Sequence, residues 1–575
     1  MILREIYRVL DTNRLLCSCL RVSLKEIEVS SKFRSEVSAA GNRLGQFCFE
    51  FDEIQPIQTY SDEKICYCSR LTLLYVALFK VISMLIKWLI SYDETALATL
   101  EWFLERFYLD IKRISDEDIR DSIDVRLVTY RNIDTEKFSI FNLPHRVFVD
   151  IFMDCLLKDT LTTKIRDQVF GDDKMLMWIG RPAITATSFF AKVLASKPEN
   201  DRVKDYVSYA YMNHGTVHYL FMQDFNAIQI LISYLDPELF LKYMLFNFVP
   251  SIRKRVCFSE NLTSIFRLNE FDDGCHLHQL LLLIYNALAE RHFVGVSDNP
   301  EYQLLERQII HSIASGYTYQ TVEDIKTSIF VYREIYFLEL TYSTYNLDEM
   351  IQKVSYTINS PDLRNTISLK PEYLNTVNMF YFMYQYSKSA CVHEKLVNLY
   401  KINQWKFQLP DLVEMRENFE GMNNFLFSDA FSDLILHILV KWYANLGTSD
   451  TGIIYNLILV SMTLCFILKV SLNQTIDSRF HKAVDFIFGI RKDLGENNVM
   501  TILALFKKRL VDDVFGSVVD YLMELSKIPT DYFTDLSETP ADMMEKPRVS
   551  RDLGFKMLGN KYQEIHRRHE KSQKR

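Results

Sequence analysis

Apolar residues recur every three or four positions over most of this 575-residue chain, which is the spacing of one face of an α-helix. Proline, which interrupts helices, is absent between Ile57 and Leu143 and again between Asp411 and Ile528. The 16 Gly and 13 Pro residues make up about 5% of the chain, against roughly 12% in average proteins. The pattern therefore predicts a mostly α protein.

Three short helices are predicted in succession after residue 300. The first runs from Glu301 to the helix-breaking Gly316. The second begins at Thr321, which is followed three residues later by Asp324, the spacing of a capping box. The third begins at Asn346. Its predicted apolar face consists of Leu347, Met350, Ile351, Val354 and Ile358.

A turn and a strand follow the third helix. Residues 359–362 read Asn-Ser-Pro-Asp, which is a turn signal, and residues 366–369 alternate polar and apolar as in a strand. Three short helices followed by a hairpin make a winged helix, which we predict for residues 301–372. Pro371 ends the strand, and the aromatic run behind it predicts a long buried helix. Its predicted stripe consists of Leu374, Val377, Tyr381 and Tyr384.

The charge of the predicted winged helix favours protein docking over DNA binding. Residues 318–375 contain five basic and eight acidic side chains, so phosphate groups would be repelled. The chain as a whole has a net charge of −8. Residues 546–575 carry ten Lys or Arg and three acidic side chains, a balance of +7, which leaves −15 on the rest. We therefore expect no nucleic-acid partner, and an acidic protein surface as the partner of the tail.

The length and these patterns predict a multi-domain helical scaffold with one embedded winged-helix domain, since 575 residues exceed the size of a single core. No pattern assigns a fold to the first 134 residues. The predicted regions are an N-terminal helical region (1–134), a helical scaffold (135–300), the winged helix (301–372), a second helical scaffold (373–530), and a linker with a basic C-terminal helix (531–575).

Two apolar segments invite comparison with membrane-spanning helices. Leu71 to Ile90 is long enough to cross a bilayer, but Lys80 and Lys87 lie on one face of it. Ile453 to Leu468 is shorter and contains polar residues. Both are interpreted as buried helices, and the N-terminus lacks the uninterrupted apolar run of a signal peptide. We expect no membrane partner, and a location in the cytoplasm, with the nucleus as the second compartment.

Metal-binding and catalytic patterns are not visible in the sequence. The ten cysteines include no pair with C-x-x-C spacing, and Cys275-His-Leu-His278 has no second cluster to complete a zinc site. None of the common nucleophile, phosphate-binding or metalloprotease motifs occurs. We therefore predict no catalytic residue, no metal ligand and no cofactor in this chain.

Four blocks of the sequence resemble a known family, the UBR-box ubiquitin ligases or N-recognins. Residues 280–325 contain Glu290-Arg-His292 and Arg307-Gln-Ile-Ile-His311, which are similar to the family's "ERF" and "REIIHQL". Residues 369–389, LKPEYLNTVNMFYFMYQYSKS, resemble its "LKPE" turn and aromatic helix. Residues 141–157, FNLPHRVFVDIFMDCLL, resemble its "FHLPLHR" helix, and residues 219–245 resemble its stretch around "DIFLLQ" and a later "DP". The similar blocks follow the family order over roughly residues 135 to 575.

The resemblance implies a function. N-recognins bind proteins with destabilising N-terminal residues and promote transfer of ubiquitin from a conjugating enzyme, which sends the substrate to the proteasome. The family's zinc-bearing UBR box and RING are not recognisable here, so the chain resembles the central scaffold of such a ligase, from a truncated gene model, a split gene or a shortened paralogue. The alternative is a non-catalytic helical adaptor without ligase activity.

The basic tail is the candidate partner site. In the family a basic helix at this place leads towards the RING and in some members contacts the ubiquitin-conjugating enzyme. The alternative is a solvated end or a nuclear-localisation-like basic patch, and Gly554 and Gly559 weaken a helix. The candidate partner-binding residues are Arg551, Phe555, Leu558, Lys561, Tyr562, Ile565, Arg567 and Arg568.

Overall fold

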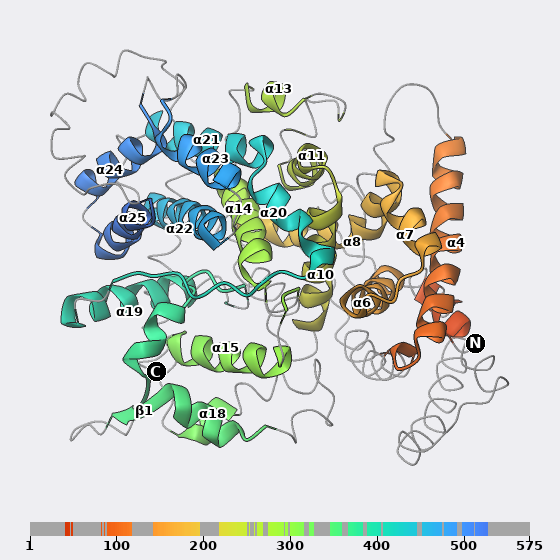
Figure 1. The fold of residues 1–575 in the computed structure, drawn as a ribbon, viewed down its shortest axis with the longest axis horizontal. Helices are drawn as coiled ribbons and strands as arrows, with labels where there is room; N and C mark the ends of the chain where they lie inside the picture. Colours follow the sequence, from red (N-terminus) through yellow and green to blue (C-terminus); the bar gives the residue numbers. More distant parts are fainter. Residues whose placement is uncertain are drawn as a thin grey trace. The chain divides into compact units, whose positions relative to one another are not determined.

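The chain is mostly helical, with one small antiparallel sheet of two strands, in the part described by its computed structural model (Figure 1). This confirms the mostly α prediction. The described residues are 41–46, 48–49, 82, 86, 89–117, 142–195, 218–249, 252, 258, 261–267, 274–291, 294–296, 299–315, 321–326, 345–358, 366–382, 384, 388–403, 406–444, 451–473, 477–490, 497–510 and 512–526.

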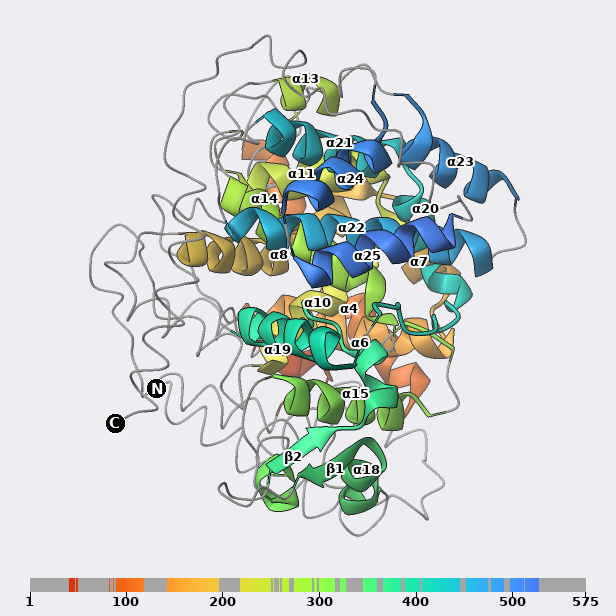
Figure 2. The same ribbon diagram turned by 90° about the vertical axis from the view of Figure 1, so that its left-hand side faces the viewer.

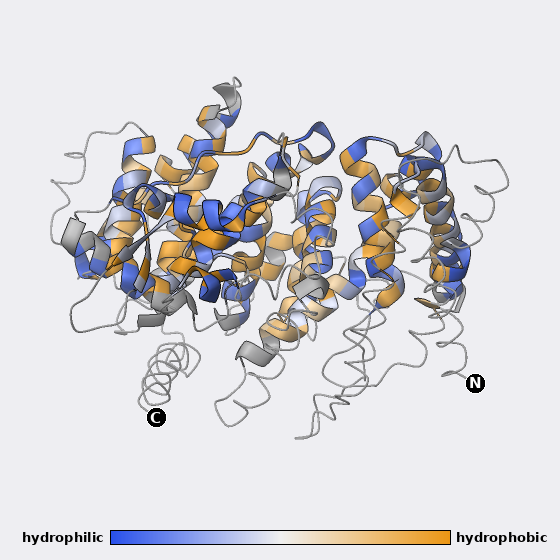
Figure 3. Cartoon of the chain, turned by 90° about the horizontal axis from the view of Figure 1, so that it is seen from below, coloured by the Kyte–Doolittle hydropathy of each residue, from blue (hydrophilic) through white to orange (hydrophobic). Residues whose placement is uncertain are grey.

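The chain divides into two compact units. Unit 1 comprises Met1–Phe189, His214–Leu231 and Tyr332–Leu340. Unit 2 comprises Phe190–Asn213, Ile232–Val331 and Thr341–Arg575. The five regions inferred from the sequence do not follow the boundaries of these units, and they stay predictions. Within the described residues, hydrophobic and hydrophilic positions lie on different sides of many helices, as Figure 3 shows by colour.

Unit 1 is built from helices whose aromatic faces meet. On α4, Phe103 and Phe107 lie against Phe148 of α6, with ring centroids 6.2 and 5.4 Å apart. α6 begins with Pro144 in its first turn, where the missing N–H needs no partner. The helices are α4 (Asp93–Glu117), α6 (Leu143–Lys158), α7 (Thr163–Phe170), α8 (Asp173–Ala195) and α10 (His218–Tyr234), of which α8 and α10 end in unit 2.

In unit 2 the apolar helix α22 packs against several other helices of the unit. It lies along α25 in both views (Figures 1 and 2) and also packs against α14 and α23. The α-helices of unit 2 are α11 (Pro237–Phe248), α13 (Leu262–Arg267), α14 (Gly274–Ala289), α15 (Pro300–Ala314), α18 (Leu347–Val354), α19 (Lys388–Asn403), α20 (Gly421–Leu426), α21 (Asp429–Ala444), α22 (Thr451–Asn473), α23 (Asp477–Phe488), α24 (Val499–Arg509) and α25 (Asp513–Leu525). Two 3-10 helices, η4 (Pro371–Thr376) and η5 (Glu417–Phe419), also belong to unit 2, and residues 322–326 are helical as well.

One stretch of the described residues, Ile454–Leu472 in α22, has the length and composition of a membrane span. In the structure 83% of it is buried inside the protein, as the core helix of a folded unit would be. The other apolar segment, residues 71–90, lies largely outside the described residues. The absence of a membrane partner stays a prediction.

The helix starts expected between residues 300 and 350 are confirmed. α15 begins after Asn299, whose side chain accepts a hydrogen bond from the Tyr302 backbone. Thr321 and Asp324 exchange the two hydrogen bonds of a capping box, at 2.8 and 3.2 Å. α18 begins after Asn346, whose side chain accepts from the first-turn backbone. Capping side chains that lie next to these helices in the sequence therefore determine where the helices begin.

A hairpin follows α18. Strand β1 (Ser355–Ile358) pairs antiparallel with β2 (Thr366–Leu369), and β2 lies against α15 (Figure 2). The predicted strand is confirmed, but the end of the predicted helix is wrong, because Ile358 belongs to β1 and its side chain is 42% exposed. The β-branched and aromatic residues of β1 favour a strand. The turn expected at residues 359–362 lies outside the described residues.

The long aromatic helix predicted after Pro371 is also wrong. η4 is followed by irregular chain, and the next α-helix, α19, begins only at Lys388. The described residues from 377 to 384 are nevertheless buried, as expected. Their backbone is held by distant side chains: Asn378 N donates to His311 Nε2, and Asn286 Nδ2 donates to Phe380 O. These tertiary hydrogen bonds replace helical ones.

The contact between α20 and the end of α10 gives a stability prediction. A methyl group on Gly421 would overlap the backbone carbonyl of Ser233, whereas one on Gly516 would meet its nearest atom, Lys507 Cε, at 3.4 Å. Gly421→Ala should therefore destabilise unit 2 by about 1–3 kcal/mol through overpacking. Gly516→Ala, near the start of α25, should be neutral or stabilising by up to about 1 kcal/mol. Urea unfolding of both variants tests the contrast, and equal effects would contradict it.

Candidate functional site

The candidate partner-binding residues of the tail all lie outside the described residues, so their role stays a prediction. In the part of the chain that the structure describes, no group of three or more His, Cys, Asp or Glu side chains could hold a metal ion. His278 is buried and interacts with Asn456, and burial lowers the pKa of its imidazole to about 4.

A buried polar network in unit 2 is the most elaborate arrangement of charged groups described. Glu290 follows the end of α14 and is 1% exposed, and Arg307 lies on α15. Arg307 Nε and Nη2 each donate to one Glu290 oxygen at 2.6 Å, and Nη1 donates to Thr376 O at 3.3 Å. The Asn378 amide donates to Glu290 at 3.1 Å and to Asn286 Oδ1 at 3.3 Å. The network therefore joins α14, α15 and the chain after η4.

His311, one turn beyond Arg307 on α15, extends this network. Its Nε2 accepts from the Asn378 backbone N–H at 2.9 Å, so the proton of the neutral ring is on Nδ1. Nδ1 then donates to Arg307 O at 2.7 Å. The imidazole also stacks on Tyr381, with ring centroids 3.9 Å apart, and the Tyr384 hydroxyl donates to His311 O at 3.2 Å. The irregular aromatic segment is thereby fixed to α15.

The two arginines near this network have different electrostatic surroundings. Burial alone lowers the pKa of Arg307, but the charge and hydrogen bonds of Glu290 outweigh burial and raise that pKa above its ordinary value. Burial lowers the pKa of Arg291 to about 10, and the charge of Glu420 opposes this shift. The Arg291 guanidinium donates to Asn423 Oδ1 at 2.7 Å and lies 5.1 Å from the centre of the Phe466 ring. At Arg307 the groups of unit 2 more than offset burial, whereas at Arg291 they offset it only in part.

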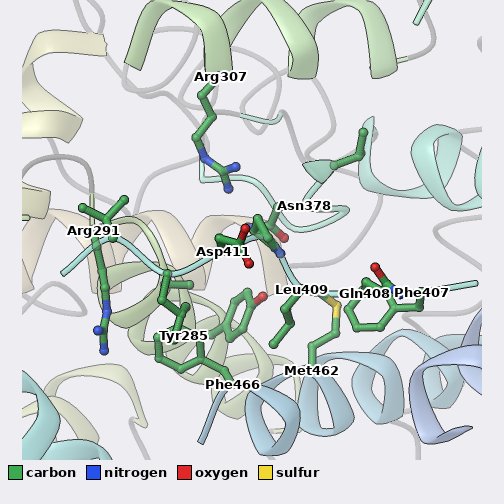
Figure 4. Close-up of a pocket in the computed structure, with 15 residues that line it drawn as sticks. Tyr285, Arg291, Arg307, Asn378, Phe407, Gln408, Leu409, Asp411, Met462 and Phe466 are labelled. Carbon is green, nitrogen blue, oxygen red and sulfur yellow. The ribbon is translucent and has the colours of Figure 1, made fainter. Parts of the chain in front are cut away.

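A small cavity adjoins the network. Its volume is about 50 Å³, and Figure 4 shows the residues that surround it. Tyr285 and Arg291 come from the α14 side, Arg307 from α15, and Met462 and Phe466 from α22. The remaining lining residues are Ala289, Val377, Asn378, Phe407, Gln408, Leu409, Pro410, Asp411, Leu412 and Val413.

The segment from Phe407 to Val413 forms one wall of the cavity, and side chains hold it in place. Lys469 Nζ donates to Leu409 O at 2.7 Å and to Pro410 O at 2.8 Å. The Phe407 backbone N–H donates to Ser517 Oγ at 2.7 Å. Beyond the segment, Met415 forms a backbone bridge with Gly295. This wall is therefore a fixed part of unit 2.

Unit 1 contains a second buried ion pair. Arg146 on α6 donates from Nε and Nη2 to the two oxygens of Asp224 on α10, at 3.0 and 2.7 Å, and both side chains are 2% exposed. Beside them, the Gln223 amide donates to Asp150 Oδ2 at 2.5 Å. The pair fixes α6 to α10 within the unit.

Sequence reasoning did not identify either ion pair. The available signal was the presence of charged residues inside apolar helices, since such residues are buried only when they are paired. Sequence spacing does not show which residues bind each other. Arg146 and its ion-pair partner Asp224 are 78 positions apart, and Asn378, which donates a hydrogen bond to Glu290, lies 88 positions from it. The groups in both networks bind one another, and this arrangement suits a rigid scaffold.

His145 gives a pH prediction for unit 1. Among the described residues, neither of its ring nitrogens has a hydrogen-bond partner, and the ring stacks on Phe107. Burial, with the charges of Arg181 and Arg146, holds the pKa of His145 well below 6.5. Below about pH 6.5 the unfolded chain takes up a proton that the folded chain does not, so stability is complete at higher pH and falls as the pH falls. His145→Phe should remove about 1–2 kcal/mol of the loss between pH 7 and pH 5.

Hydrogen exchange of α6 peptides at pH 7 and pH 5, corrected for the intrinsic exchange rates, measures this difference. An unchanged pH dependence in His145→Phe would contradict the prediction. Because no hydrogen bond of His145 is lost in the variant, its stability at pH 7 serves as the internal control.

No model of a known protein family matches this chain, and no curated protein sequence matches it.

Proposed function

We propose that this chain is the helical scaffold of a ubiquitin protein ligase of the N-degron pathway. In this proposal the ligase recognises proteins with destabilising N-terminal residues and promotes their ubiquitination and proteasomal degradation. The chain itself supplies rigidity and orientation, which accelerate transfer by holding conjugating enzyme and substrate close together. In this proposal zinc belongs to the UBR box and RING of such a ligase, and this chain itself needs no cofactor.

The observation that carries the proposal concerns the four blocks that resemble N-recognins. Blocks 141–157 and 219–245 are joined by the Arg146–Asp224 pair. Blocks 280–325 and 369–389 are joined where Asn378 binds Glu290 and His311. Segments that are far apart in the sequence thus meet through buried charged or polar side chains that belong to those blocks. This supports the interpretation that the resemblance reflects a shared folded scaffold.

The elements from α15 to β2 support the finer proposal of a winged helix at residues 301–372. Two helices, the capped start at Thr321 and the β1–β2 hairpin follow in the order of that fold. Asp348 and Glu349 open α18, which would be the third helix; Asp348 is half-buried and pairs with Lys326, and Glu349 is exposed. Acidic side chains at this place oppose phosphate binding, so we propose a protein-docking winged helix without nucleic-acid or membrane contact.

A pair of reporter proteins tests the function. The reporters differ only in their first residue, Arg or Met, and are exposed by cleavage of an N-terminal ubiquitin in cells that express this chain. Depletion of the chain should lengthen the half-life of the Arg reporter and leave the Met reporter unchanged. Restoring the full chain should restore rapid loss. Equal half-lives of the Arg reporter with and without the chain would reject the N-degron function.

Ubiquitin transfer by the isolated complex distinguishes the ligase from the adaptor. The chain, captured from these cells with its partners, should support ubiquitin transfer when activating and conjugating enzymes are added. The purified chain alone should support none and should contain no stoichiometric zinc. Captured complexes that lack transfer activity would favour the non-catalytic adaptor.

The tail is the proposed contact with the ubiquitin-conjugating enzyme. Full-length protein should bind the enzyme with an affinity that falls as salt increases, because the contact is between opposite charges. A chain that ends at Glu545 should bind much more weakly. Isothermal titration of the enzyme against both proteins measures this. Equal binding by the two, or no binding by either, would reject a role for the tail.

A further inference from the structure

Arg291 is a buried arginine without a carboxylate partner in the described part of the chain. Arg146 and Arg307, in the two networks above, each bind both oxygens of one carboxylate. Arg291 is 4% exposed and takes part in no ion pair with a described residue. Its Nε donates to Leu288 O at 3.2 Å and its Nη2 donates to Asn423 Oδ1 at 2.7 Å, and both acceptors are neutral. A buried charge without a counter-ion is costly, so an anion beside Arg291 would be stabilised.

The charge of Glu420 acts on Arg291, but both oxygens of this carboxylate already bind other groups. Oε1 accepts from Arg479 Nη1 at 3.0 Å, and Oε2 accepts from Asn423 Nδ2 at 2.9 Å. Two arginines thus share one negative charge, and burial still lowers the pKa of Arg291 to about 10. The surroundings of Arg291 therefore retain a net positive charge.

Arg291 lines the small cavity, where the other charged groups are balanced. Arg307 is paired with Glu290, and Asp411 lies 3.4 Å from Lys469. Nη1 of Arg291 makes no hydrogen bond to a described residue, so its N–H groups are available to an occupant. A carboxylate fits these donors, because charge-assisted hydrogen bonds from a guanidinium to a carboxylate are stronger than those between neutral groups.

The rest of the lining and the volume limit the anion to a small one. Phe466 and Met462 are buried apolar side chains, and the centre of the Phe466 ring lies 5.1 Å from Arg291 Cζ. One water needs about 10–15 Å³ of such a volume, so the cavity of about 50 Å³ has room for roughly four non-hydrogen atoms. Acetate has this size. A phosphate dianion would bring a second negative charge into the cavity that no further cation compensates.

We propose that this cavity is a binding site for a small monocarboxylate of the size of acetate, with its oxygens at the Arg291 guanidinium and its methyl group against Phe466. The site follows from the buried charge and the cavity, and it does not depend on the ligase function. Its failure would therefore leave that function untouched.

Methyl NMR of the full-length chain with ¹³C-labelled methionine methyl groups, at constant ionic strength, tests the proposal. Met462 lines the cavity, and Met462→Leu identifies its signal because the variant lacks it. Titration with acetate should shift this signal saturably, with a dissociation constant on the order of millimolar for so small a ligand. Acetamide, which has the same size but no charge, should bind at least about 10-fold more weakly. Benzoate, an anion too large for the cavity, should give no saturable shift.

Two charge variants show whether Arg291 binds the anion. Arg291→Met removes the charge and keeps a long apolar side chain, so the affinity for acetate should fall at least about 10-fold. Glu420→Gln removes the charge that partly offsets Arg291, so the affinity for acetate should rise about 2–10-fold. Unchanged signals of the other methionines show that each variant is folded.

Three results would each overturn the proposal. The first is no saturable shift of the Met462 signal by acetate, which would mean that water alone occupies the cavity. The second is a response to acetamide or benzoate as strong as the response to acetate. The third is an affinity for acetate that neither charge variant changes. If Arg291→Met does not fold, Glu420→Gln alone decides this third point.

Discussion

Arg307→Ala is expected to destabilise unit 2 by about 3–5 kcal/mol, because Glu290 would remain buried without its partner. Glu290 is 1% exposed and receives two hydrogen bonds of 2.6 Å from Arg307, beside the one of 3.1 Å from Asn378. The Arg307 contact with Thr376 O would also be lost. Hydrogen exchange of peptides from α14, α15 and the segment after η4 measures the loss, and protection should fall in all three.

Two further variants show whether the effect comes from the unpaired charge. Arg307→Met combined with Glu290→Leu removes both charges and should recover most of the lost stability. Lys353→Ala breaks the pair with Glu306 at the surface, where Lys353 is 48% exposed, and should cost no more than about 1 kcal/mol. An Arg307→Ala protein within about 1 kcal/mol of wild type would contradict a buried, desolvated pair.

The sequence predicted those elements whose signals are local. Thr321 with Asp324, and Asn346 before α18, are capping residues whose partners lie within three positions. Such contacts form whatever the rest of the chain does. The alternation of polar and apolar residues likewise predicted β2. In the structure its apolar residues Ile367 and Leu369 are buried.

The predictions of secondary structure are wrong where tertiary contacts determine the local conformation. Val354 and Ile358 have the spacing of one helix face, but the chain leaves the helix at Ser355 and pairs with β2. Residues 377–384 have the apolar periodicity of a helix. The backbone N–H of Asn378 nevertheless donates its hydrogen bond to the side chain of His311, 67 positions away. The spacing of apolar residues along the sequence does not reveal that a distant side chain will replace a helical hydrogen bond.

From the sequence, the candidate site could be predicted only as a set of polar residues that lie among apolar neighbours. Glu290, Arg307 and Asn378 are polar residues in apolar surroundings, which indicates burial and pairing. Their convergence requires α14, α15 and the chain after η4 to be assembled first. The cavity follows from the same assembly, since its walls come from segments more than 100 positions apart. The tail, by contrast, is a charge pattern, and its role stays a prediction.

Arg146→Ala is expected to destabilise unit 1 by about 3–5 kcal/mol for the corresponding reason, since the buried Asp224 carboxylate would lose the guanidinium that binds both of its oxygens. Both side chains are 2% exposed, and the two hydrogen bonds between them are 3.0 and 2.7 Å long. Lys164→Ala, which breaks an exposed pair with Glu101, is the matched control and should cost no more than about 1 kcal/mol. Hydrogen exchange of peptides from α6 and α10 measures both variants.

The double variant Arg146→Met with Asp224→Leu separates a structural role of this pair from a binding role. If the pair only joins α6 to α10, two apolar side chains of similar volume should be neutral or stabilising. The double variant should then also restore the turnover of the Arg reporter that Arg146→Ala loses through unfolding. A folded double variant that fails to restore turnover would mean that the charges contact a substrate or partner, and would contradict the interpretation of this pair as part of the scaffold.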